Sequence, residues 1–104
     1  MKAEEVFSTL SSKTRLEILK VLASRSGDLM EIKRALDASG LGIKYRESVY
    51  RALERLASAE LVEKFYDRNE KKIKYALAVR EIRVRFGPSG VELKIARRPP
   101  ESQG

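Results

Sequence analysis

The spacing of the apolar residues changes near Leu61, and this change constrains the fold more than any other feature of the sequence. Before it, apolar residues recur every three or four positions, as in helices. After it, short stretches are rich in β-branched and aromatic residues, as in strands. Helices followed by strands predict an α+β fold. With 104 residues, we expect a single domain over residues 1–97 and a flexible tail, 98–104, whose two prolines continue neither helix nor strand.

Two short helices are expected at the start of the chain. Apolar residues at helical spacing predict the first over residues 2–10. Ser11 or Ser12 can cap the second, because a serine hydroxyl accepts a hydrogen bond from a free amide of the first turn. Gly27 is expected to end this second helix. Its apolar residues form a stripe that is predicted to be buried: Leu16, Ile18, Leu19 and Leu22.

A third helix is expected to begin at Asp28. Asp28 and Glu31 have the spacing of a capping box, in which each side chain accepts a hydrogen bond from the other residue's backbone amide. Segment 37–43, with two glycines, then forms a turn before a fourth helix over residues 44–59. One face of the fourth helix is apolar, with Val49, Leu53 and Leu56, and the other is polar: Glu47, Ser48, Arg51, Glu54, Arg55 and Ser58. We expect the apolar face to pack and the polar face to stay free.

Two β-hairpins are expected after the helices. Residues 61–66 and 73–79 form the strands of the first, and the polar segment 67–72 forms its tip. The second hairpin is expected over residues 80–97, with a turn at 87–90. This turn places apolar residues opposite apolar residues, namely Phe86 and Val91, Val84 and Leu93, and Ile82 and Ile95. It also places Arg85 opposite Glu92. The second hairpin therefore has an apolar face that must cover either the helices or a second subunit.

The aromatic residues are expected to be internal. Tyr66 and Tyr75 are predicted to pack within the first hairpin, and Phe7, Phe65 and Phe86 occupy apolar-face positions that predict core packing. With only 4 Tyr, 3 Phe and no Trp, the chain has too few aromatics for a surface that stacks single-stranded nucleic acid.

Charge and composition narrow the possible functions. The chain has 22 Lys and Arg against 15 Asp and Glu, and most of the net charge of +7 lies after residue 40. This excess favours nucleic acid or an anionic membrane surface as partner. Cysteine and histidine are absent, which excludes disulfides, ordinary zinc sites and histidine-based catalysis. We therefore expect no enzyme, no metal and no cofactor.

Two further expectations concern the setting of the protein. The sequence has neither a membrane-spanning apolar run nor a signal peptide, so we expect a cytoplasmic protein. Only Asn69 and Gln103 carry side-chain amides, and Lys, Glu and Arg are frequent, which is typical of heat-adapted proteins.

The order of elements is that of a winged helix-turn-helix, in which a recognition helix enters the DNA major groove and a hairpin wing touches the backbone. Residues 10–22, LSSKTRLEILKVL, resemble the opening signature of the ArsR-type winged-helix transcriptional regulators. Residues 47–63 resemble the recognition helix of that family and its exit into the wing, and residues 74–77 resemble the returning wing strand. The resemblance covers residues 5–79, and archaeal and bacterial regulators share the pattern.

The resemblance implies a sequence-specific regulator that binds double-stranded DNA as a homodimer. Three departures limit what it implies. Residues 28–36 lack the cysteines of the metal-sensing members, and the turn 37–45 is longer than theirs. The chain also ends in the hairpin 80–97 where those regulators have a C-terminal helix that helps them dimerise. The dimer interface, the operator and any effector ligand stay open.

Residue by residue, the resemblance places the recognition helix at 44–59 and the wing at 66–74. Arg46 and Arg51 are the best candidates for base contacts, because an arginine can donate two hydrogen bonds to guanine. Arg55 is placed to reach the backbone. The full set of expected DNA contacts is Lys44, Arg46, Glu47, Ser48, Tyr50, Arg51 and Arg55 on the helix, and Arg68, Lys71, Lys72 and Lys74 on the wing.

Plainer interpretations stay open at this point. The polar helix face can be merely solvated, with Glu47 paired to Arg51 at helical spacing. The wing charges can serve only to keep a sheet edge soluble. The same fold also serves as a protein-assembly or RNA-binding module, and a basic surface suits a non-specific chromatin protein.

Overall fold

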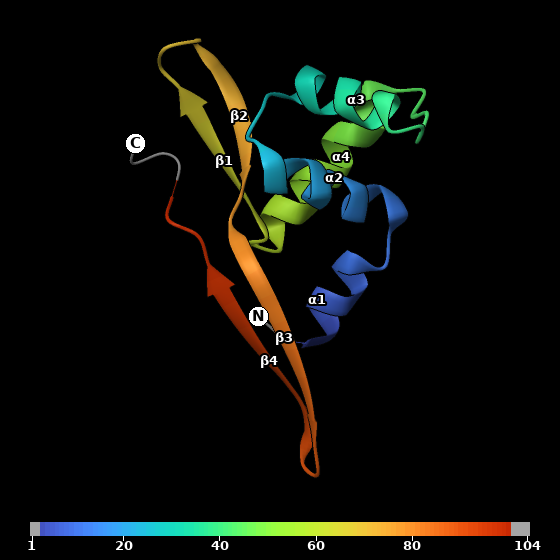
Figure 1. Cartoon of the computed structure of the whole chain (residues 1–104), viewed down its shortest axis with the longest axis vertical. Coiled ribbons are helices and arrows are strands. Elements are labelled where there is room, and N and C mark those ends of the chain that lie inside the picture. The colour runs from blue at the N-terminus through green and yellow to red at the C-terminus, as the bar shows by residue number, and fades with distance from the viewer. Residues whose placement is uncertain (1–2, 101–104) are drawn as a thin grey trace.

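In the computed structural model, which describes residues 3–100, four helices precede two antiparallel β-hairpins (Figure 1). The helices are α1 (Ala3–Leu10), α2 (Lys13–Ser24), α3 (Leu29–Ala38) and α4 (Arg46–Ser58). The strands are β1 (Val62–Asp67), β2 (Lys72–Leu77), β3 (Val79–Gly87) and β4 (Gly90–Arg97). The predicted α+β order of four helices and two hairpins is confirmed. Of the predicted tail, residues 98–100 have no regular structure and residues 101–104 lie outside the described range.

The predicted start signals of α2 and α3 are confirmed. Ser12 Oγ accepts a hydrogen bond from the backbone amide of Arg15 at 3.3 Å. Asp28 Oδ1 accepts from the amide of Glu31 at 2.8 Å, and Glu31 Oε1 accepts from the amide of Asp28 at 3.0 Å. These side chains satisfy amides that the first turn of a helix leaves without partners.

Several helix boundaries differ from the prediction: α3 continues to Ala38, into the predicted turn 37–43, and α4 ends at Ser58, one residue earlier than predicted. Helix α2 ends at Ser24, before Gly27, because the backbone of Gly27 forms a β-bridge with Tyr75 through N···O distances of 3.0 and 2.8 Å. Helix α4 begins at Arg46, so residue 44 lies in the preceding connection. Tyr45 has an extended backbone and makes no side-chain cap. The α2–α3 connection thus contributes one residue of pairing to the edge of β2.

A single apolar cluster joins α2, α3 and α4 to the base of the first hairpin. Its fully buried side chains include Ile18, Leu22, Ile32, Leu36, Val49, Leu53, Leu56 and Leu61. Each such side chain stabilises the fold by about 1.5–3 kcal/mol relative to solvent exposure. The predicted burial of Val49, Leu53 and Leu56 on α4 is confirmed.

The predicted buried stripe of α2 was too wide. Ile18 and Leu22 are buried, but Leu16 is 48% exposed. Residues four apart share a helix face, whereas Leu16 precedes Ile18 by only two positions and therefore points to another side.

Strands β2 and β3 follow one another with only Ala78 between them, and β1 and β4 lie alongside them (Figure 1). The amide of Ala78 donates to Leu61 O, and the amide of Arg98 donates to Ala78 O, each at 3.0 Å. The two hairpins therefore form one long ribbon, and the helices pack beside its upper and middle parts (Figure 1).

The register of the second hairpin is the predicted one. Phe86 lies opposite Val91, Val84 opposite Leu93, and Ile82 opposite Ile95. Arg85 lies opposite Glu92, and their side chains form an ion pair at 3.6 Å. Apolar alternation around the turn was sufficient to determine this pairing because a one-residue slip would place every side chain on the wrong face.

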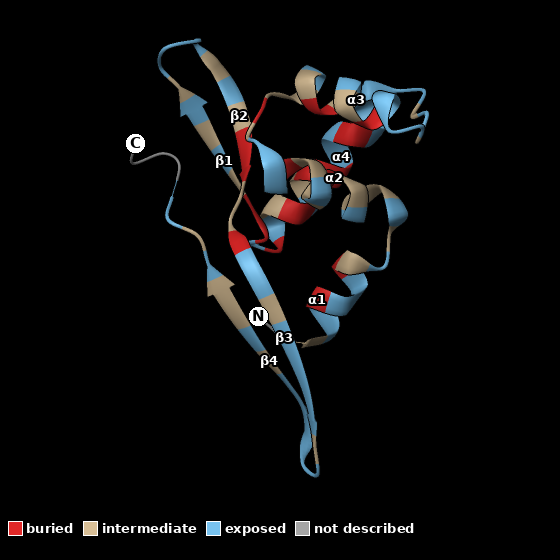
Figure 2. Cartoon of the chain, in the orientation of Figure 1, coloured by how far each residue is buried: buried red, intermediate tan, exposed pale blue. Residues whose placement is uncertain are grey.

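The aromatic predictions hold only in part. Tyr75 is buried and Phe65 is half-buried, but Phe7, Tyr66 and Phe86 are exposed, Phe86 by 80%. Phe86 is exposed because it lies near the tip of the second hairpin. Figure 2 shows that this hairpin extends past α1, so no helix covers its tip. Tyr66 lies toward the tip of the first hairpin, and Phe7 lies on the outer side of a helix with only eight residues.

Asp28 combines its capping role with an ion pair to the first hairpin. Its Oδ2 lies 2.7 Å from Lys72 Nζ. Partial burial raises the pKa of Asp28, but the hydrogen bonds from Lys72 and from the amide of Glu31 outweigh it, so the pKa lies below its ordinary value of 3.8. Ionised Asp28 therefore stabilises the fold above pH 3.8, and this stabilisation is lost as the pH falls through the lower folded-state pKa.

We predict that Asp28→Ala lowers the free energy of unfolding at neutral pH by about 1–2 kcal/mol, because the helix cap is lost. Asp28→Asn keeps a capping oxygen but removes the charge, so the acid dependence of stability should become shallower. Urea denaturation between neutral and acidic pH measures both effects. Asp37→Ala is the matched control: Asp37 forms an exposed ion pair with Lys33 at 2.9 Å, and its loss should cost no more than about 0.5 kcal/mol. Equal losses for the two alanine variants would contradict the prediction.

Candidate nucleic-acid interface

Helix α4 presents a row of polar side chains to solvent because its opposite face is held in the core. Val49, Leu53 and Leu56 are fully buried. All six polar or aromatic residues predicted as helix contacts are exposed: Arg46, Glu47, Ser48, Tyr50, Arg51 and Arg55. Lys44, predicted as part of this helix, is exposed in the connection before it, with its Nζ 5.4 Å from the ring centroid of Tyr45.

Arg46 and Arg51 have free guanidinium groups. Within residues 3–100, neither arginine forms an ion pair or a side-chain hydrogen bond, and Glu47 does not pair with Arg51. The Glu47–Arg51 pair of the plainer interpretation is therefore absent, while its central statement, that the polar face is merely solvated, stays open. Both arginines keep their full donor capacity for a ligand.

The spacing of residues on α4 predicted that Glu54 lies free on the polar face. In the structure it is bound. Its Oε2 accepts a hydrogen bond from the Tyr75 hydroxyl at 3.0 Å and lies 3.2 Å from Lys64 Nζ. Burial raises the pKa of Tyr75, and the neighbouring Glu54 carboxylate raises it further. Lys64 Nζ also lies 6.0 Å from the centroid of the Tyr50 ring, within cation–π range. These contacts connect α4 to the first hairpin and hold their relative orientation.

A basic groove of about 430 Å³ lies between the start of α2 and the outer face of α4. Hydroxyl groups and three arginines line it: Ser12, Thr14, Arg15, Ser48, Arg51 and Arg55, with Ala52. Arg15 is occupied within the protein, since its Nε donates to Thr9 O at 2.5 Å and its Nη2 to Ser8 O at 3.1 Å. Arg55 Nη2 reaches Ser8 Oγ at 3.4 Å. Arg51 is the arginine of this groove without a protein partner in the described range.

Sequence reasoning missed Ser12, Thr14 and Arg15 as neighbours of the α4 face. Part of the signal was present, because Ser12 marks the start of a helix and the amino end of a helix attracts anions. The sequence could not reveal that this helix start lies beside α4.

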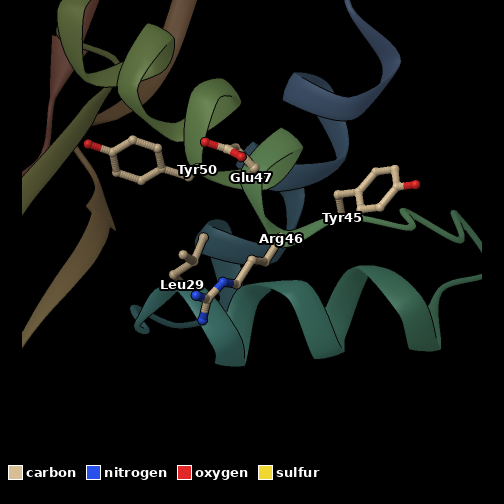
Figure 3. A pocket seen from close by; sticks show the side chains of 5 residues that line it. All are labelled: Leu29, Tyr45, Arg46, Glu47 and Tyr50. Atoms are coloured by element: carbon tan, nitrogen blue, oxygen red, sulfur yellow. The ribbon is translucent and has the colours of Figure 1, made fainter.

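A second hollow, of about 410 Å³, lies between α3 and α4 (Figure 3). In Figure 3 the Arg46 side chain runs toward Leu29 at the start of α3, whereas Tyr45 and Tyr50 point to opposite sides. The lining side chains do not converge on one point. This hollow is therefore a surface groove beside α4 and has no arrangement of catalytic groups.

The four predicted wing cations fall into two groups. Lys72 is bound to Asp28, and Lys74 Nζ lies 2.9 Å from Asp67 Oδ2 and also pairs with Glu70. These two lysines are neutralised within the fold. Arg68 and Lys71, at the tip, are exposed and form no ion pair with another residue in the range 3–100.

The tip itself is held by Asp67. Its Oδ1 accepts hydrogen bonds from the amides of Asn69 at 2.9 Å and Glu70 at 3.1 Å. The hydrogen bond from Lys74 lowers the pKa of Asp67, and the hydrogen bond from the amide of Asn69 lowers it further. Desolvation raises this pKa by less, so it lies below its ordinary value. Lys71 has a φ of 56°, in the left-handed region, which closes the turn into β2. The two free cations thus project from an ordered tip.

Other kinds of site are not evident in the described residues. No group of three or more Asp or Glu side chains in residues 3–100 is placed to hold a metal ion. The longest helix in this range, α4, has 13 residues, and no helix has the length and apolar character needed to cross a bilayer. In comparisons with known proteins, no family model and no curated protein matches the chain.

We predict that Glu54→Ala destabilises the protein by about 1–3 kcal/mol, because it leaves the buried Tyr75 hydroxyl without its acceptor. Glu47→Ala on the same helix should change stability by no more than about 0.5 kcal/mol, since Glu47 is exposed and has no partner in residues 3–100. Thermal or urea unfolding monitored by circular dichroism compares the two variants. If Glu54→Ala is as stable as Glu47→Ala, the Tyr75–Glu54 bond does not secure the hairpin to α4.

Proposed function

We propose that the chain is a sequence-specific, double-stranded-DNA-binding transcriptional regulator of the winged helix-turn-helix type. In this proposal α3 and α4 are the helix-turn-helix, and β1 and β2 with their tip are the wing. The observation that carries it is Arg51, an unpartnered arginine on the face of α4 opposite to the buried stripe, together with Arg46, which is unpartnered and exposed in the first turn of the same helix.

The proposed contact begins with the fit of α4 to the major groove, which is wide enough to admit one helix. Arg51 then donates two hydrogen bonds to a guanine edge, and Arg46 reads a second position or the flanking backbone. Ser48 and Tyr50 are both exposed and have hydroxyl donors, on opposite flanks of the helix because they are two residues apart. The groove beside Arg51 takes a backbone phosphate, supported by the hydroxyls of Ser12 and Thr14.

The proposed wing contact uses fewer residues than the sequence implied. Arg68 and Lys71 reach a phosphate or the minor groove, since they are exposed and have no ion pair within residues 3–100. Lys72 and Lys74 instead hold the wing through their carboxylate partners. The net charge of +7 supplies attraction that does not depend on base sequence.

The rest of the proposal follows the ArsR-type resemblance. The protein acts as a cytoplasmic homodimer on paired half-sites, without catalytic activity, metal or cofactor. Each subunit presents one α4 to one half-site, because regulators of this architecture read symmetric operators.

The primary test is a fluorescence-anisotropy titration against duplexes selected from random sequence, with random duplex and RNA as competitors, at several salt concentrations. A preference of at least about a thousandfold for selected duplex supports the regulator. Strongly salt-dependent binding without preference would replace it with a non-specific chromatin protein. The absence of binding to any nucleic acid would favour an assembly module, and preference for RNA would favour an RNA-binding module.

We predict that Arg51→Ala weakens binding to the selected duplex by about 1–3 kcal/mol and relaxes the base preference at one position. Arg83→Ala is the matched control, because Arg83 is exposed on the second hairpin and paired with Glu81. It should leave both affinity and preference unchanged. If Arg51→Ala retains the affinity and preference of the unmodified protein, α4 is not the reading helix.

We predict that the double variant Arg68→Ala/Lys71→Ala reduces the salt dependence of binding. Each lost phosphate contact lowers the slope of log K against log salt by about 0.9. Lys74→Ala should leave that slope unchanged and instead lower the unfolding midpoint, because Lys74 is paired with Asp67 and Glu70. Equal slopes for Arg68→Ala/Lys71→Ala and the unmodified protein would remove the wing from the interface.

A further inference from the structure

The two flanks of α4 face different parts of the molecule. One flank lines the groove beside the start of α2, through Ser48 and Arg55. The opposite flank carries Tyr50 and Glu54, which are four residues apart, and in Figure 3 the Tyr50 side chain points toward the strands. Arg51 lies between the two flanks. A ligand that reaches Arg51 therefore has α2 on one side and the first hairpin on the other.

The first hairpin turns one face toward α4, and we call it the inner face. In the register of β1 and β2, Lys64 lies opposite Tyr75, and Tyr66 lies opposite Ile73. Lys64 Nζ and the Tyr75 hydroxyl lie 3.2 and 3.0 Å from Glu54 Oε2 on α4, so these two residues identify the inner face. Residues two apart in a strand share a face, so Tyr66 and Ile73 continue the inner face toward the tip.

The part of the inner face nearer the tip is uncovered. Tyr66 is 56% exposed and Ile73 is 44% exposed, and Tyr50 on the adjoining flank of α4 is 42% exposed. The Tyr50 ring lies beside the inner face, with its centroid 6.0 Å from Lys64 Nζ. Within residues 3–100, neither the Tyr50 nor the Tyr66 hydroxyl forms a hydrogen bond. This surface therefore combines two aromatic rings, an aliphatic side chain and two free hydroxyl donors.

The charges beside this surface permit an anion to approach. Asp67, the acid that follows Tyr66, is paired with Lys74 at 2.9 Å. Arg68 and Lys71, at the tip beyond it, are exposed and have no ion pair in the described range. Apolar side chains and hydroxyl donors bordered by free cations suit a sugar–phosphate backbone, whose phosphates accept hydrogen bonds from tyrosine.

The shape of a DNA duplex gives a reason for a contact on this flank. A helix that occupies the major groove lies between the two backbones that border the groove. In the proposed function one backbone reaches the groove beside Arg51, which Ser12 and Thr14 also line. The other backbone then passes along the opposite flank of α4, where the inner face of the hairpin lies.

We propose that Tyr66 and Ile73, together with Tyr50, form a second backbone-binding surface, which packs on the sugars of the DNA strand at the hairpin side of α4. The hydroxyls of Tyr50 and Tyr66 donate to the flanking phosphates. None of these side chains is charged, so the contact adds affinity without releasing counterions. This inference rests on the proposed function and deepens it, because it assigns the second DNA strand to a named surface.

A salt series of fluorescence-anisotropy titrations with the selected duplex tests this surface. Tyr66→Thr and Ile73→Thr keep a β-branched residue in the strand and remove the larger apolar side chain. Each should weaken binding roughly threefold or more at every salt concentration, because apolar contact area is lost. The slope of log K against log salt should stay unchanged, because no cation is removed. Circular dichroism and urea unfolding verify that each variant is folded.

Phe86→Thr is the matched control. Phe86 is an exposed aromatic on the second hairpin, whose tip lies at the opposite end of the ribbon from the tip of the first (Figure 1). Its replacement should change neither the affinity nor the slope. The proposal is overturned if Tyr66→Thr and Ile73→Thr bind as tightly as Phe86→Thr, or if their loss of affinity appears only as a changed salt slope.

Directed cleavage of DNA tests the position of the surface without relying on affinity. The chain has no cysteine, so Tyr66→Cys and Thr14→Cys each provide a single thiol for an iron chelate that cuts nearby backbone. The two conjugates should cut opposite strands on the two sides of the same stretch of major groove. A Phe86→Cys conjugate should not cut there. No cleavage from Tyr66→Cys, or cleavage of the same strand as Thr14→Cys, would contradict the arrangement.

Failure of this inference can be distinguished from failure of the proposed function. If Arg51→Ala weakens binding and Tyr66→Thr does not, the proposed function stands and the second backbone-binding surface is excluded. If the unmodified protein binds no duplex DNA, both proposals fail. A preference for RNA also excludes both, because the deep and narrow major groove of an RNA helix does not admit side chains of α4.

Discussion

The burial of one face of α4 is the constraint on which the rest of the structure depends. Val49, Leu53 and Leu56 are inaccessible to solvent and contact the same core as α2, α3 and the base of the first hairpin. Because a helix repeats every 3.6 residues, burying this stripe determines which side chains point outward. The exposure of Arg51 therefore follows from apolar packing on the opposite side of the same helix, whereas Arg46, three residues before Val49 on the same side, is exposed because it lies in the first turn.

Electrostatics then divides the basic residues into those that hold the fold and those that remain free. Lys64, Lys72 and Lys74 each have a carboxylate partner that connects two segments of the chain. Arg46, Arg51, Arg68 and Lys71 have none in the described range. The net charge alone does not distinguish these groups. The proposed interface is consequently smaller and more sharply located than the total of 22 Lys and Arg would indicate.

The parts of the fold predictable from sequence were those determined by neighbours along the chain. The capping box of Asp28 and Glu31 involves residues three apart, and the second hairpin pairs residues around a short turn. The predictions failed where the exposure or pairing of a side chain depends on contact with a segment that is distant in the sequence. Phe86 occupies an apolar position but extends beyond the helices, and Glu54 occupies a polar position but is bound by Tyr75, 21 residues away. Apolar periodicity identifies a face without revealing whether another element reaches it.

The sequence by itself determined the element order, the face of α4 that packs and the register of the second hairpin, because periodicity and turn chemistry act over a few residues. Only the tertiary structure decided which cations are free, because an ion pair such as Lys72–Asp28 joins residues far apart in sequence. It also decided that the apolar strip of the second hairpin is covered at Ile82 and uncovered at Phe86. Such distinctions depend on how far the helices extend along the ribbon, which is a property of the assembled core.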